Sequence, residues 1–329
     1  PMSAPSASAA ATMSPRRELT SQCICPAALW GVRCRRQRVY SGCPFTHEVP
    51  PLARIHYDAL RLERIARLQA ENAAKVRSAK LAPRPPAPVG DHIERLRAEA
   101  VVQYDTDAHP LGQLIAAVLE CMPGEALSAL HLRPLPEEPP LCPTLLHAFR
   151  LNGRKLPSEF TNLMGPGRNR KLLAKLWASA AYRRWLDGYD AWVRAVVLPA
   201  AGGDAIYYQR PPTLRVAMPS VAATIGIHRD ADYPRHQPAE INWWCPLVDV
   251  ADSSALWLES APERGDFAPR ALRVGEALRF NGSLCRHHTV ANQSGITRVS
   301  FDLRAIPAAA VVGEPPGRIG DYDVAFMAP

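Results

Sequence analysis

Seven short segments with the composition of β-strands follow one another between residues 205 and 307. Each is rich in apolar, β-branched or aromatic residues, and turn-forming residues separate it from the next. The segments are "AIYYQRPPTLRVAMP", "ATIGIHRD", "EINWWCPLVDV", "SALWLES", "ALRVGEALRFNG", "RHHTVAN" and "TRVSFDLRAIP". No helical pattern interrupts the series, so the strands are expected to pair antiparallel in a β sandwich or barrel.

Helical patterns occur before this region. The most strongly helical stretch covers residues 169–198, where apolar residues recur at intervals of three and four. Its apolar face holds Leu173, Leu176, Trp177, Ala180, Trp185, Trp192 and Val196. Aromatic residues at helical spacing usually pack in a core, so we expect this helix to cover one face of the sheet. Residues 57–81 show a second long amphipathic pattern, and shorter helices are expected near residues 91–104 and 110–121.

Composition divides the chain into four parts. Residues 1–50 form a terminal segment, residues 51–140 a helical extension, residues 141–310 the β-rich domain with its backing helix, and residues 311–329 a C-terminal tail. Within the helical extension, the stretch "APRPPAPVG" at residues 82–90 is predicted to be a stiff linker because of its proline content.

The N-terminal segment has a biased composition. Residues 1–46 are rich in Ala, Ser and Arg, and Glu18 is their only acidic residue. This composition resembles that of organellar transit peptides, and the other interpretation is a disordered tail. The protein is therefore expected in the cytoplasm or in an organelle.

The formal net charge of +8 raises the question of a nucleic-acid partner. Residues 1–90 hold fourteen of the 39 Lys and Arg residues and five of the 31 Asp and Glu residues, so their formal charge is +9 and that of the rest is −1. A polyanion is attracted by the field of the surface that binds it. The β-rich region is therefore not expected to bind nucleic acid.

Hydropathy and cysteine content exclude two further classes of protein. No run of eighteen apolar residues occurs, so no membrane span is predicted. Eight cysteines are too few and too scattered for a disulfide-stapled scaffold, and free thiols in a reducing compartment are expected. Four of them gather between Cys23 and Cys43, but their spacings match no standard zinc motif.

Side chains that can bind metals gather in "IGIHRDADYPRH" at residues 225–236, where a strand-like segment ends. His228 and Asp230 are two positions apart, and alternate side chains of a strand share one face. The imidazole and the carboxylate are therefore expected to point into one cavity. Two histidines and one carboxylate can occupy one face of an octahedral ferrous ion and leave three positions open, so a further histidine is expected from another strand.

That histidine is expected in "CRHHTVANQSGITRVSFDLR", residues 285–304. His287 and His288 are adjacent there, and only one can face inward in an extended segment. Alternation then places Arg298 and Ser300 on one face of the next strand. A guanidinium can donate two parallel hydrogen bonds to a carboxylate, and a serine hydroxyl supplies a third donor. The intervening "ANQSG" is expected to be a hairpin turn that lays Arg298 beside the histidine strand.

Together these elements resemble the Fe(II)- and 2-oxoglutarate-dependent dioxygenases. The shared pattern is His-x-Asp, a distal His and Arg-x-Ser about ten residues later, here His228, Asp230, His287, Arg298 and Ser300. Four segments are similar to the streptomycin-biosynthesis oxygenase-like branch, and more distantly to phytanoyl-CoA hydroxylases: "YYQRPPTLRVAMPS", "HQPAEINWWCPLVDV", "LWLESAPERGDFAP" and "FNGSLCRHHTVANQSGITRVSFDLR". The resemblance covers roughly residues 200–307. It implies an α+β fold whose core, at residues 205–307, is a double-stranded β-helix of the jelly-roll or cupin-like kind.

The resemblance also implies cofactors and roles. The two histidines and the aspartate of the pattern would bind Fe(II), while its arginine and serine would hold the far carboxylate of 2-oxoglutarate. His287 is preferred over His288 because the resembling family places its ligand directly after Cys-Arg. With dioxygen as oxidant, the expected reaction is hydroxylation of a small-molecule metabolite, without a nucleic-acid or membrane partner. Asp230 argues against halogenation, since halogenating relatives carry a small residue in place of the carboxylate.

Other polar and aromatic residues of the β-rich region are candidates for contacts with the substrate or with the metal ligands. They are Gln209, Arg215, His236, Asn242, Trp244 and His288. The pair Asn242 and Trp244 alternates with its neighbours along a strand, so either this pair or the neighbouring one lines the cavity. His236 and Glu240 carry metal-ligand side chains, but their place on the polar side of "HQPAEIN" favours structural hydrogen bonding.

A second function stays open from the residues alone. The same segments could form a non-catalytic β-barrel that binds a metal or another ligand, with a degenerate oxygenase fold. In that case His228 and Asp230 would belong to a surface turn, and Arg298 would be an ordinary strand residue paired with Asp302.

Overall fold

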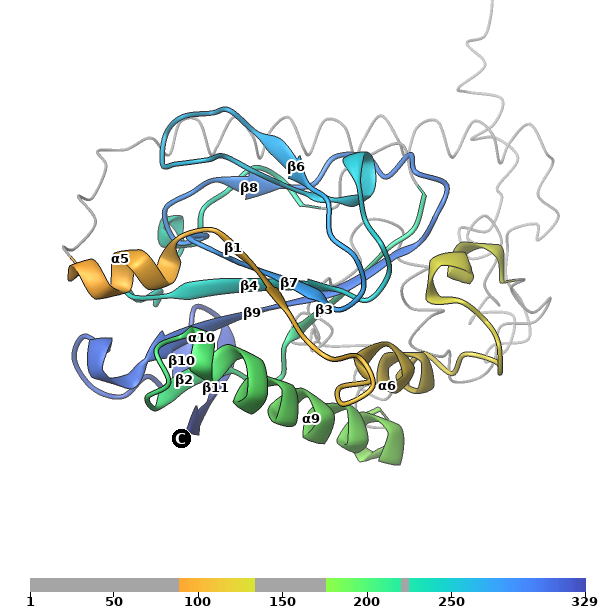
Figure 1. Ribbon diagram of the computed structural model, residues 1–329, viewed down its shortest axis with the longest axis horizontal. Helices are drawn as coiled ribbons and strands as arrows, with labels where there is room; N and C mark the ends of the chain where they lie inside the picture. The colour runs from red at the N-terminus through yellow and green to blue at the C-terminus, as the bar shows by residue number, and fades with distance from the viewer. Residues whose placement is uncertain (1–88, 134–175, 220–224) are drawn as a thin grey trace, which may run out of the picture. The chain divides into compact units, whose positions relative to one another are not determined.

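The structure of the protein, a computed structural model, describes residues 89–133, 176–219 and 225–329 (Figure 1). These residues all belong to the larger of the two units into which the chain divides. The expected N-terminal segment, the helix at residues 57–81, the cysteine cluster and most of the proline-rich linker lie outside the described residues.

Two antiparallel sheets form this unit. In the larger sheet the strand order is β1-β7-β4-β9-β2-β11-β10, and β3 pairs with β9 beside this path. Its strands are β1 (Ala100–Gln103), β2 (Ile206–Gln209), β3 (Thr213–Ala217), β4 (Ile241–Pro246), β7 (Glu276–Phe280), β9 (Arg298–Pro307), β10 (Arg318–Ile319) and β11 (Tyr322–Met327). The smaller sheet has the order β6-β5-β8, with β5 (Leu256–Leu258), β6 (Ala268–Arg270) and β8 (His287–His288).

Strand β9 is the longest strand and separates two environments. It pairs with β4 along one edge and with β2 and β3 along the other. Because successive side chains of a strand point to opposite faces, Val299, Phe301 and Leu303 share one face, where they are fully buried in the hydrophobic core. Arg298 and Ser300 have the opposite phase and belong to the other face.

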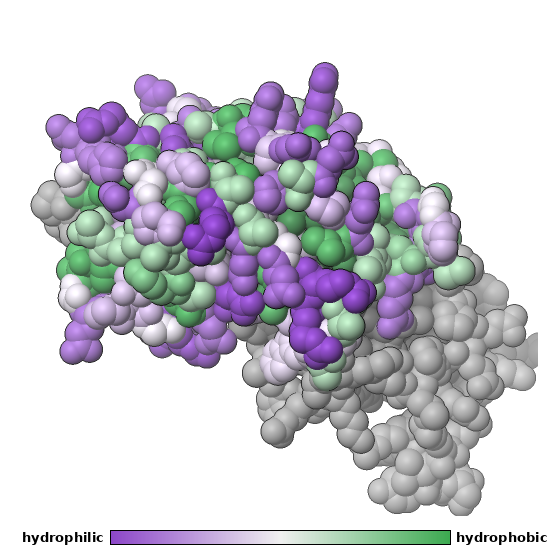
Figure 2. Space-filling model, turned by 60° about the horizontal axis from the view of Figure 1, so that its bottom comes forward, coloured by the Kyte–Doolittle hydropathy of each residue, from purple (hydrophilic) through white to green (hydrophobic). Residues whose placement is uncertain are grey.

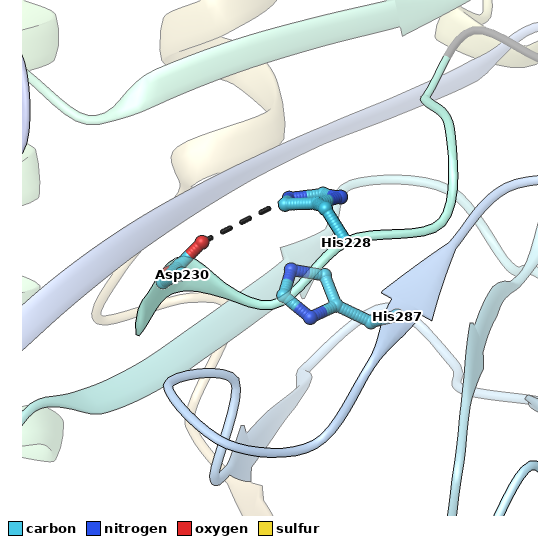
Figure 3. Close-up of side chains that lie close together, drawn as sticks. All are labelled: His228, Asp230 and His287. Atoms are coloured by element: carbon cyan, nitrogen blue, oxygen red, sulfur yellow. Dashed lines mark ion pairs between the residues drawn. The ribbon is translucent and has the colours of Figure 1, made fainter. Parts of the chain in front are cut away.

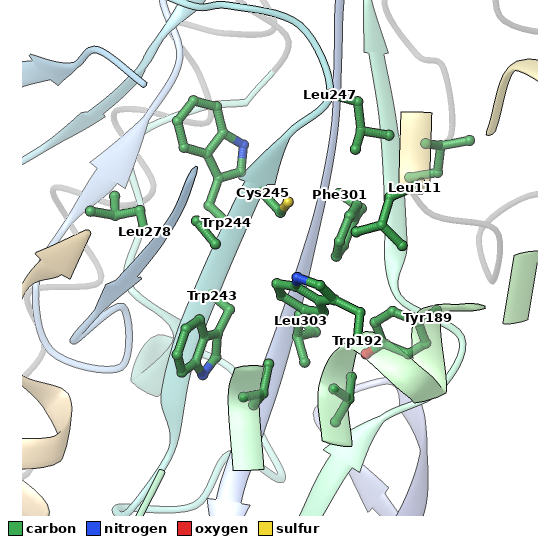
Figure 4. Packing of buried hydrophobic residues seen from close by; sticks show 14 of the residues in the cluster. Leu111, Tyr189, Trp192, Trp243, Trp244, Cys245, Leu247, Leu278, Phe301 and Leu303 are labelled. Carbon is green, nitrogen blue, oxygen red and sulfur yellow. The ribbon is translucent and has the colours of Figure 1, made fainter. Parts of the chain in front are cut away.

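Helices cover the apolar face of the large sheet (Figure 1). The main one is α9 (Ala180–Trp192), which continues through a π-helical turn (Val193–Val197) into the short α10 (Leu198–Ala200). The hydroxyl of Ser179 accepts a hydrogen bond from the Tyr182 amide and caps the start of α9. The rings of Trp185 and Trp192 each lie 5.4 Å from the ring of Phe301 on β9, centroid to centroid. Figure 4 shows Trp192 and Phe301 in this layer.

Shorter helical segments complete the described part of the chain. These are α5 (Asp91–Arg97), α6 (Leu111–Val118) and the 3-10 segments Leu127–Leu132, Asp230–Asp232, Asp252–Ser254 and Ala308–Ala310. On α6, Leu111, Ile115 and Val118 recur at helical spacing and are buried in the same core as α9. The helix predicted near residues 110–121 is therefore confirmed as α6.

The large sheet receives strands from outside the region where we expected them. The predicted helix at residues 91–104 ends at Arg97, and its second half is β1, which pairs with β7. The predicted C-terminal tail contains β11, which pairs with β2. Both strands extend the sheet laterally, and a short apolar run takes its conformation from such a partner. Assigning β1 to a helix was therefore wrong.

Two expectations about the site segments were also wrong. Within the described part of "ATIGIHRD", His228 forms only an isolated bridge and Asp230 opens a 3-10 turn instead of continuing a strand. The segment "ANQSG" makes no hairpin, because β8 belongs to the small sheet and β9 to the large one. The side-chain amide of Asn292 donates to the carbonyl oxygens of Ala217 and Ile296 and holds this crossing segment in place.

At the level of class, the expected combination of helices and antiparallel sheets is confirmed. On the face shown in Figure 2, hydrophilic residues are interspersed with hydrophobic ones. Within the described ranges, no helix combines the length and the hydropathy that a membrane crossing requires.

Candidate metal centre

Three side chains with metal-ligand atoms meet in the structure (Figure 3). Each of His228, Asp230 and His287 has a ligand atom within 4.8 Å of the others. Nε2 of His228 lies 3.8 Å from Oδ1 of Asp230, and the two imidazole centroids are 4.3 Å apart. Asp230 and His287 are buried. The fold thus brings together the three residues that the sequence pattern singled out.

These residues do not lie in a regular strand, and individual backbone hydrogen bonds position them instead. The amide of His287 donates to the carbonyl oxygen of His228 at 2.8 Å, and the amide of His228 donates back at 3.2 Å. The Asp230 amide donates to the carbonyl oxygen of Gly282 at 2.9 Å. A Cβ atom at Gly282 would lie 2.5 Å from Cγ of Asn242, so only glycine allows the two segments to come this close.

Both histidines have one ring nitrogen engaged by a backbone carbonyl. Nδ1 of His228 lies 2.9 Å from the oxygen of Gly226, and Nδ1 of His287 lies 3.2 Å from the oxygen of Cys285. Because a carbonyl oxygen can only accept, each Nδ1 carries the proton and each Nε2 keeps its lone pair. Histidines that bind metals are commonly oriented in this way.

The electrostatic surroundings favour the same protonation state. Burial, together with the neighbouring His228, lowers the pKa of His287 to about 3. Burial also lowers the pKa of His228. For Asp230, burial raises the pKa, but the charge and hydrogen bonds of Arg304 and the two nearby histidines together outweigh burial and hold the pKa well below its usual range. At neutral pH the site therefore offers two neutral imidazoles and one carboxylate, which is what a metal ion requires.

This donor set fits a ferrous ion. Two imidazole nitrogens and one carboxylate oxygen are the protein ligands of non-haem Fe(II) sites, and they leave further coordination positions open. Zinc also accepts nitrogen and oxygen ligands of these kinds, so the identity of the metal has to be tested by its chemistry.

Only one of the two adjacent histidines joins the cluster. His288 is directed to the other side of β8, where its ring lies 4.9 Å from the ring of Phe267 and 6.1 Å from that of Trp257. Its partner in the sequence, His287, faces Asp230 (Figure 3). The alternation of side chains along β8 separates the two, as the sequence analysis required of an extended segment.

Arg298 and Ser300 have unsatisfied donors in the interior of the protein. Nε of Arg298 and Oγ of Ser300 are buried and lack a hydrogen-bond partner within the described residues. A long hydrogen bond of 3.5 Å joins Nη1 of Arg298 to the carbonyl oxygen of Ser254. Burial, together with the nearby charge of Arg215, lowers the pKa of Arg298 to about 10. An anion beside Arg298 would relieve this cost, so a carboxylate fits the place.

The alternative in which Arg298 pairs with Asp302 does not hold. Asp302 instead forms salt bridges with Arg215 and with Arg304, whose Nη1 lies 3.0 Å from Oδ2 of Asp302. In the part of the chain that the structure describes, no carboxylate lies within salt-bridge distance of Arg298. Among the buried arginines on this face, Arg298 is thus the one left for an anion from outside.

One cavity connects the metal-ligand candidates with Arg298. From the large sheet its walls are formed by Arg215, Asn242, Trp244, Phe280, Arg298, Asp302 and Arg304. His228, His287, Leu256 and Thr289 line it as well. Trp243 also borders the cavity, but its ring packs against that of Trp192 at 6.4 Å. Asn242 donates to Asp230, so the inward pair on β4 is Asn242 and Trp244.

The remaining candidates make internal contacts. The side-chain oxygen of Gln209 accepts from Arg304 at 3.2 Å, and its amide donates to Oγ1 of Thr213 at 2.9 Å. Nδ1 of His236 lies 2.7 Å from Oε2 of Glu240. His236, Glu240 and Asp230 have ligand atoms within 4.8 Å of one another, but the guanidinium of Arg304 is already bound to Asp230. The structural hydrogen bonding favoured for His236 and Glu240 agrees with these contacts.

Sequence reasoning missed Arg304. Its side chain is buried and donates from Nε to Oδ2 of Asp230 at 2.9 Å and from Nη2 to Oδ1 at 3.3 Å. The signal was present, because Arg298, Ser300, Asp302 and Arg304 occupy every second position of β9 and share one face. Extending the alternation of Arg-x-Ser by two further steps would have placed Arg304 on the cavity face, although it would not have shown that Arg304 binds Asp230.

Comparison with known proteins gives one related sequence of clear similarity. Over 156 residues the chain is 33% identical to the streptomycin biosynthesis protein StrG of Streptomyces griseus, which covers 43% of this chain and 73% of StrG. No family model matches the chain.

Solved structures with partial similarity include SnoK and EvdO2. The carbocyclase SnoK from nogalamycin biosynthesis, titled non-haem and α-ketoglutarate dependent, is 11% identical with a TM-score of 0.37 over 72% of this chain and 96% of SnoK. EvdO2 of Micromonospora carbonacea var. aurantiaca is 16% identical with a TM-score of 0.35 over 70% of this chain and 96% of EvdO2. The sequence match to StrG shows the relationship by itself: the chain belongs to the StrG family, the streptomycin-biosynthesis branch of the iron- and 2-oxoglutarate-dependent oxygenases that its motifs resemble.

Proposed function

We propose that the protein is a non-haem Fe(II)- and 2-oxoglutarate-dependent dioxygenase that hydroxylates a small-molecule metabolite. One observation carries this proposal. The ligand atoms of His228, Asp230 and His287 lie within 4.8 Å of one another and line the same cavity as Arg298, a buried arginine whose Nε has no partner within the described residues. A metal ion that accepts nitrogen and oxygen ligands matches the first feature. A carboxylate of a bound dicarboxylic acid matches the second.

The side chains around the cavity have separate tasks in this proposal. Nε2 of His228, Nε2 of His287 and a carboxylate oxygen of Asp230 hold the metal. Arg298 and Ser300 donate hydrogen bonds to the far carboxylate of 2-oxoglutarate, and charge-assisted bonds of this kind are the strong ones. Iron bound with 2-oxoglutarate supplies the oxidation of a C–H bond by dioxygen, with release of succinate and carbon dioxide. Apolar walls from Trp244, Leu256 and Phe280 exclude water from that chemistry.

The fold and domain limits form part of the same proposal. The two facing sheets that supply the cavity walls support a double-stranded β-helix with its core at residues 205–307, extended by β1 and β11. We assign residues 141–310 to the catalytic domain, the preceding residues 51–140 to an extension that helps to shape it, and residues 1–50 to a targeting or disordered segment of a cytoplasmic or organellar enzyme. The substrate is a small molecule, and neither nucleic acid nor a membrane takes part.

The test is an anaerobic titration with Fe(II) and 2-oxoglutarate, followed by visible absorption. A chelated ferrous site gives a weak charge-transfer band, and the unmodified protein should show it. His228→Ala should abolish the band, whereas His288→Ala should preserve it, because His288 lies on the other side of β8. If the unmodified protein shows no band and retains zinc after purification, the protein is a metal-binding β-protein without this activity.

A further inference from the structure

The polar face of β9 continues beyond the two residues already assigned to 2-oxoglutarate. Two and four positions after Ser300 lie Asp302 and Arg304, both of which line the cavity. Arg304 is nearly inaccessible to solvent, at 4% exposed. Its guanidinium contacts both carboxylate oxygens of Asp230, through Nε to Oδ2 at 2.9 Å and through Nη2 to Oδ1 at 3.3 Å.

Arg304 is itself fixed from three sides. Nη1 donates to Oδ2 of Asp302 at 3.0 Å and to Oε1 of Gln209 at 3.2 Å. The guanidinium carbon lies 4.6 Å from the centroid of the Tyr322 ring, within the range of a cation–π contact. Asp302 is held in turn by Arg215. These contacts fix the position and the orientation of the guanidinium. The guanidinium in turn orients the carboxylate that it binds.

The two oxygens of Asp230 are not equivalent in this arrangement. Oδ2 accepts from Nε of Arg304 and also from Nδ2 of Asn242 at 2.6 Å. Oδ1 accepts only the longer bond from Arg304 among the described residues, and it is the oxygen that lies 3.8 Å from Nε2 of His228. The two shorter bonds thus turn Oδ2 away from the histidines and leave Oδ1 facing them.

We propose that Arg304 is a positioning residue that, with Asn242, holds Asp230 as a ligand through Oδ1 alone. The inference rests on the proposed function, since it assumes that Asp230 binds the metal. It adds a residue to the site that lies 74 positions from Asp230 in the sequence. An aspartate locked in this way cannot turn to offer both oxygens, so Asp230 would hold the metal through one oxygen while Arg304 and Asn242 keep the other.

The experiment uses Co(II) as a spectroscopic probe added to the metal-free full-length protein. Its visible bands report both affinity and coordination without any turnover. Arg304→Gln should weaken Co(II) binding by about 10–100-fold and change the band pattern, as expected when a partner of a metal ligand is lost. Arg304→Lys keeps the positive charge but cannot bridge both oxygens, so it should fail to restore the affinity.

The matched control is Arg97→Gln. Arg97 is also a buried arginine, with hydrogen bonds to Glu94 and to the carbonyl oxygen of Pro238, and it does not line the cavity. This variant should bind Co(II) like the unmodified protein. Circular dichroism establishes that each variant is folded. If the Arg304 variants do not fold, Asn242→Ala provides the test, since it removes one of the two bonds to Oδ2 and should weaken binding in the same direction.

The possible outcomes separate the two claims. The positioning role would be overturned if Arg304→Gln bound Co(II) as tightly as the unmodified protein or more tightly, or if Arg304→Lys restored the full affinity. Where Asn242→Ala is the only folded variant, unchanged Co(II) binding by that variant would overturn it. Failure of the proposed function would look different: the unmodified protein would not bind Co(II), or His228→Ala would bind it equally well.

Discussion

Among the individual residues, Arg298 gives the clearest indication of which ligand the cavity binds. Burying a guanidinium without a counter-ion is costly, and its lowered pKa of about 10 reflects that burial. Arg215 and Arg304 on the same face share Asp230 and Asp302 as counter-ions. Arg298 has no such partner among the described residues, so its charge is available for a ligand.

Replacing Arg298 should weaken the binding of 2-oxoglutarate and leave the binding of the metal unchanged. Arg298→Ala removes charge-assisted hydrogen bonds, each worth about 1.5–3 kcal/mol, which corresponds to a roughly ten- to hundredfold weaker affinity for 2-oxoglutarate. The concentration of 2-oxoglutarate that half-saturates the charge-transfer band measures this. Arg210→Ala is the control, because Arg210 pairs with Asp190 at 2.9 Å and does not line the cavity. Equal affinities in the two variants would remove Arg298 from the proposal.

The buried histidines should make the metal-free protein sensitive to acid. An unfolded histidine has a pKa of about 6.5, whereas burial lowers that of His287 to about 3. Between these values the unfolded chain binds more protons, so the free energy of unfolding falls as the pH falls from about 6.5 towards 3. One such residue contributes a slope of up to about 1.4 kcal/mol per pH unit.

Denaturant unfolding of the metal-free protein between pH 7.5 and 5 tests this dependence. His287→Gln cannot take up the proton, so its stability should decline less steeply than that of the unmodified protein. Parallel curves for the two proteins would mean that His287 does not titrate as its burial indicates.

At the scale of the elements, β9 joins the core to the site. One of its faces packs Phe301 against Trp185 and Trp192, and the other carries Arg298 and Arg304. A strand anchored by large aromatic contacts on one face positions polar side chains rigidly on the other. The geometry of the site therefore depends on the packing of α9 on the sheet.

A substitution on the apolar face should cost stability on the scale of a core cavity. Phe301→Ala is expected to lower the free energy of unfolding by about 3–5 kcal/mol. Phe326→Ala, on β11 and 56% exposed, should cost about 1 kcal/mol or less. Chemical denaturation of both variants decides the matter, and similar losses would contradict the assignment of Phe301 to the central core.

Short elements also show where sequence reasoning reaches its limit. The strand β1, "AVVQ", follows α5 after two residues, and its four residues carry too little periodicity to separate strand from helix. Its conformation is set by pairing with β7, more than 170 residues away. The expected hairpin at "ANQSG" failed for a related reason, since a turn sequence does not reveal whether the chain returns to the same sheet or crosses to another.

For the molecule as a whole, the candidate ligands were predictable and their supporting network was not. Spacing and residue type identified His228 and Asp230, and the family resemblance selected His287 over His288. Asp230 nevertheless lies in a 3-10 turn, and the hydrogen bonds of that loop bring it into place. The choice of Asn242 and Trp244 as the inward pair required the fold, because alternation alone leaves either phase open. Arg304 acts across 74 residues of sequence, and no local pattern connects it to its partner.

The most direct test of the whole account is a crystal structure of the anaerobic complex with Fe(II) and 2-oxoglutarate, with data recorded at the iron absorption edge. The account predicts one iron peak between Nε2 of His228, Nε2 of His287 and Oδ1 of Asp230, with the far carboxylate of 2-oxoglutarate against Arg298. An iron peak elsewhere, or a co-substrate whose far carboxylate avoids Arg298, would contradict it.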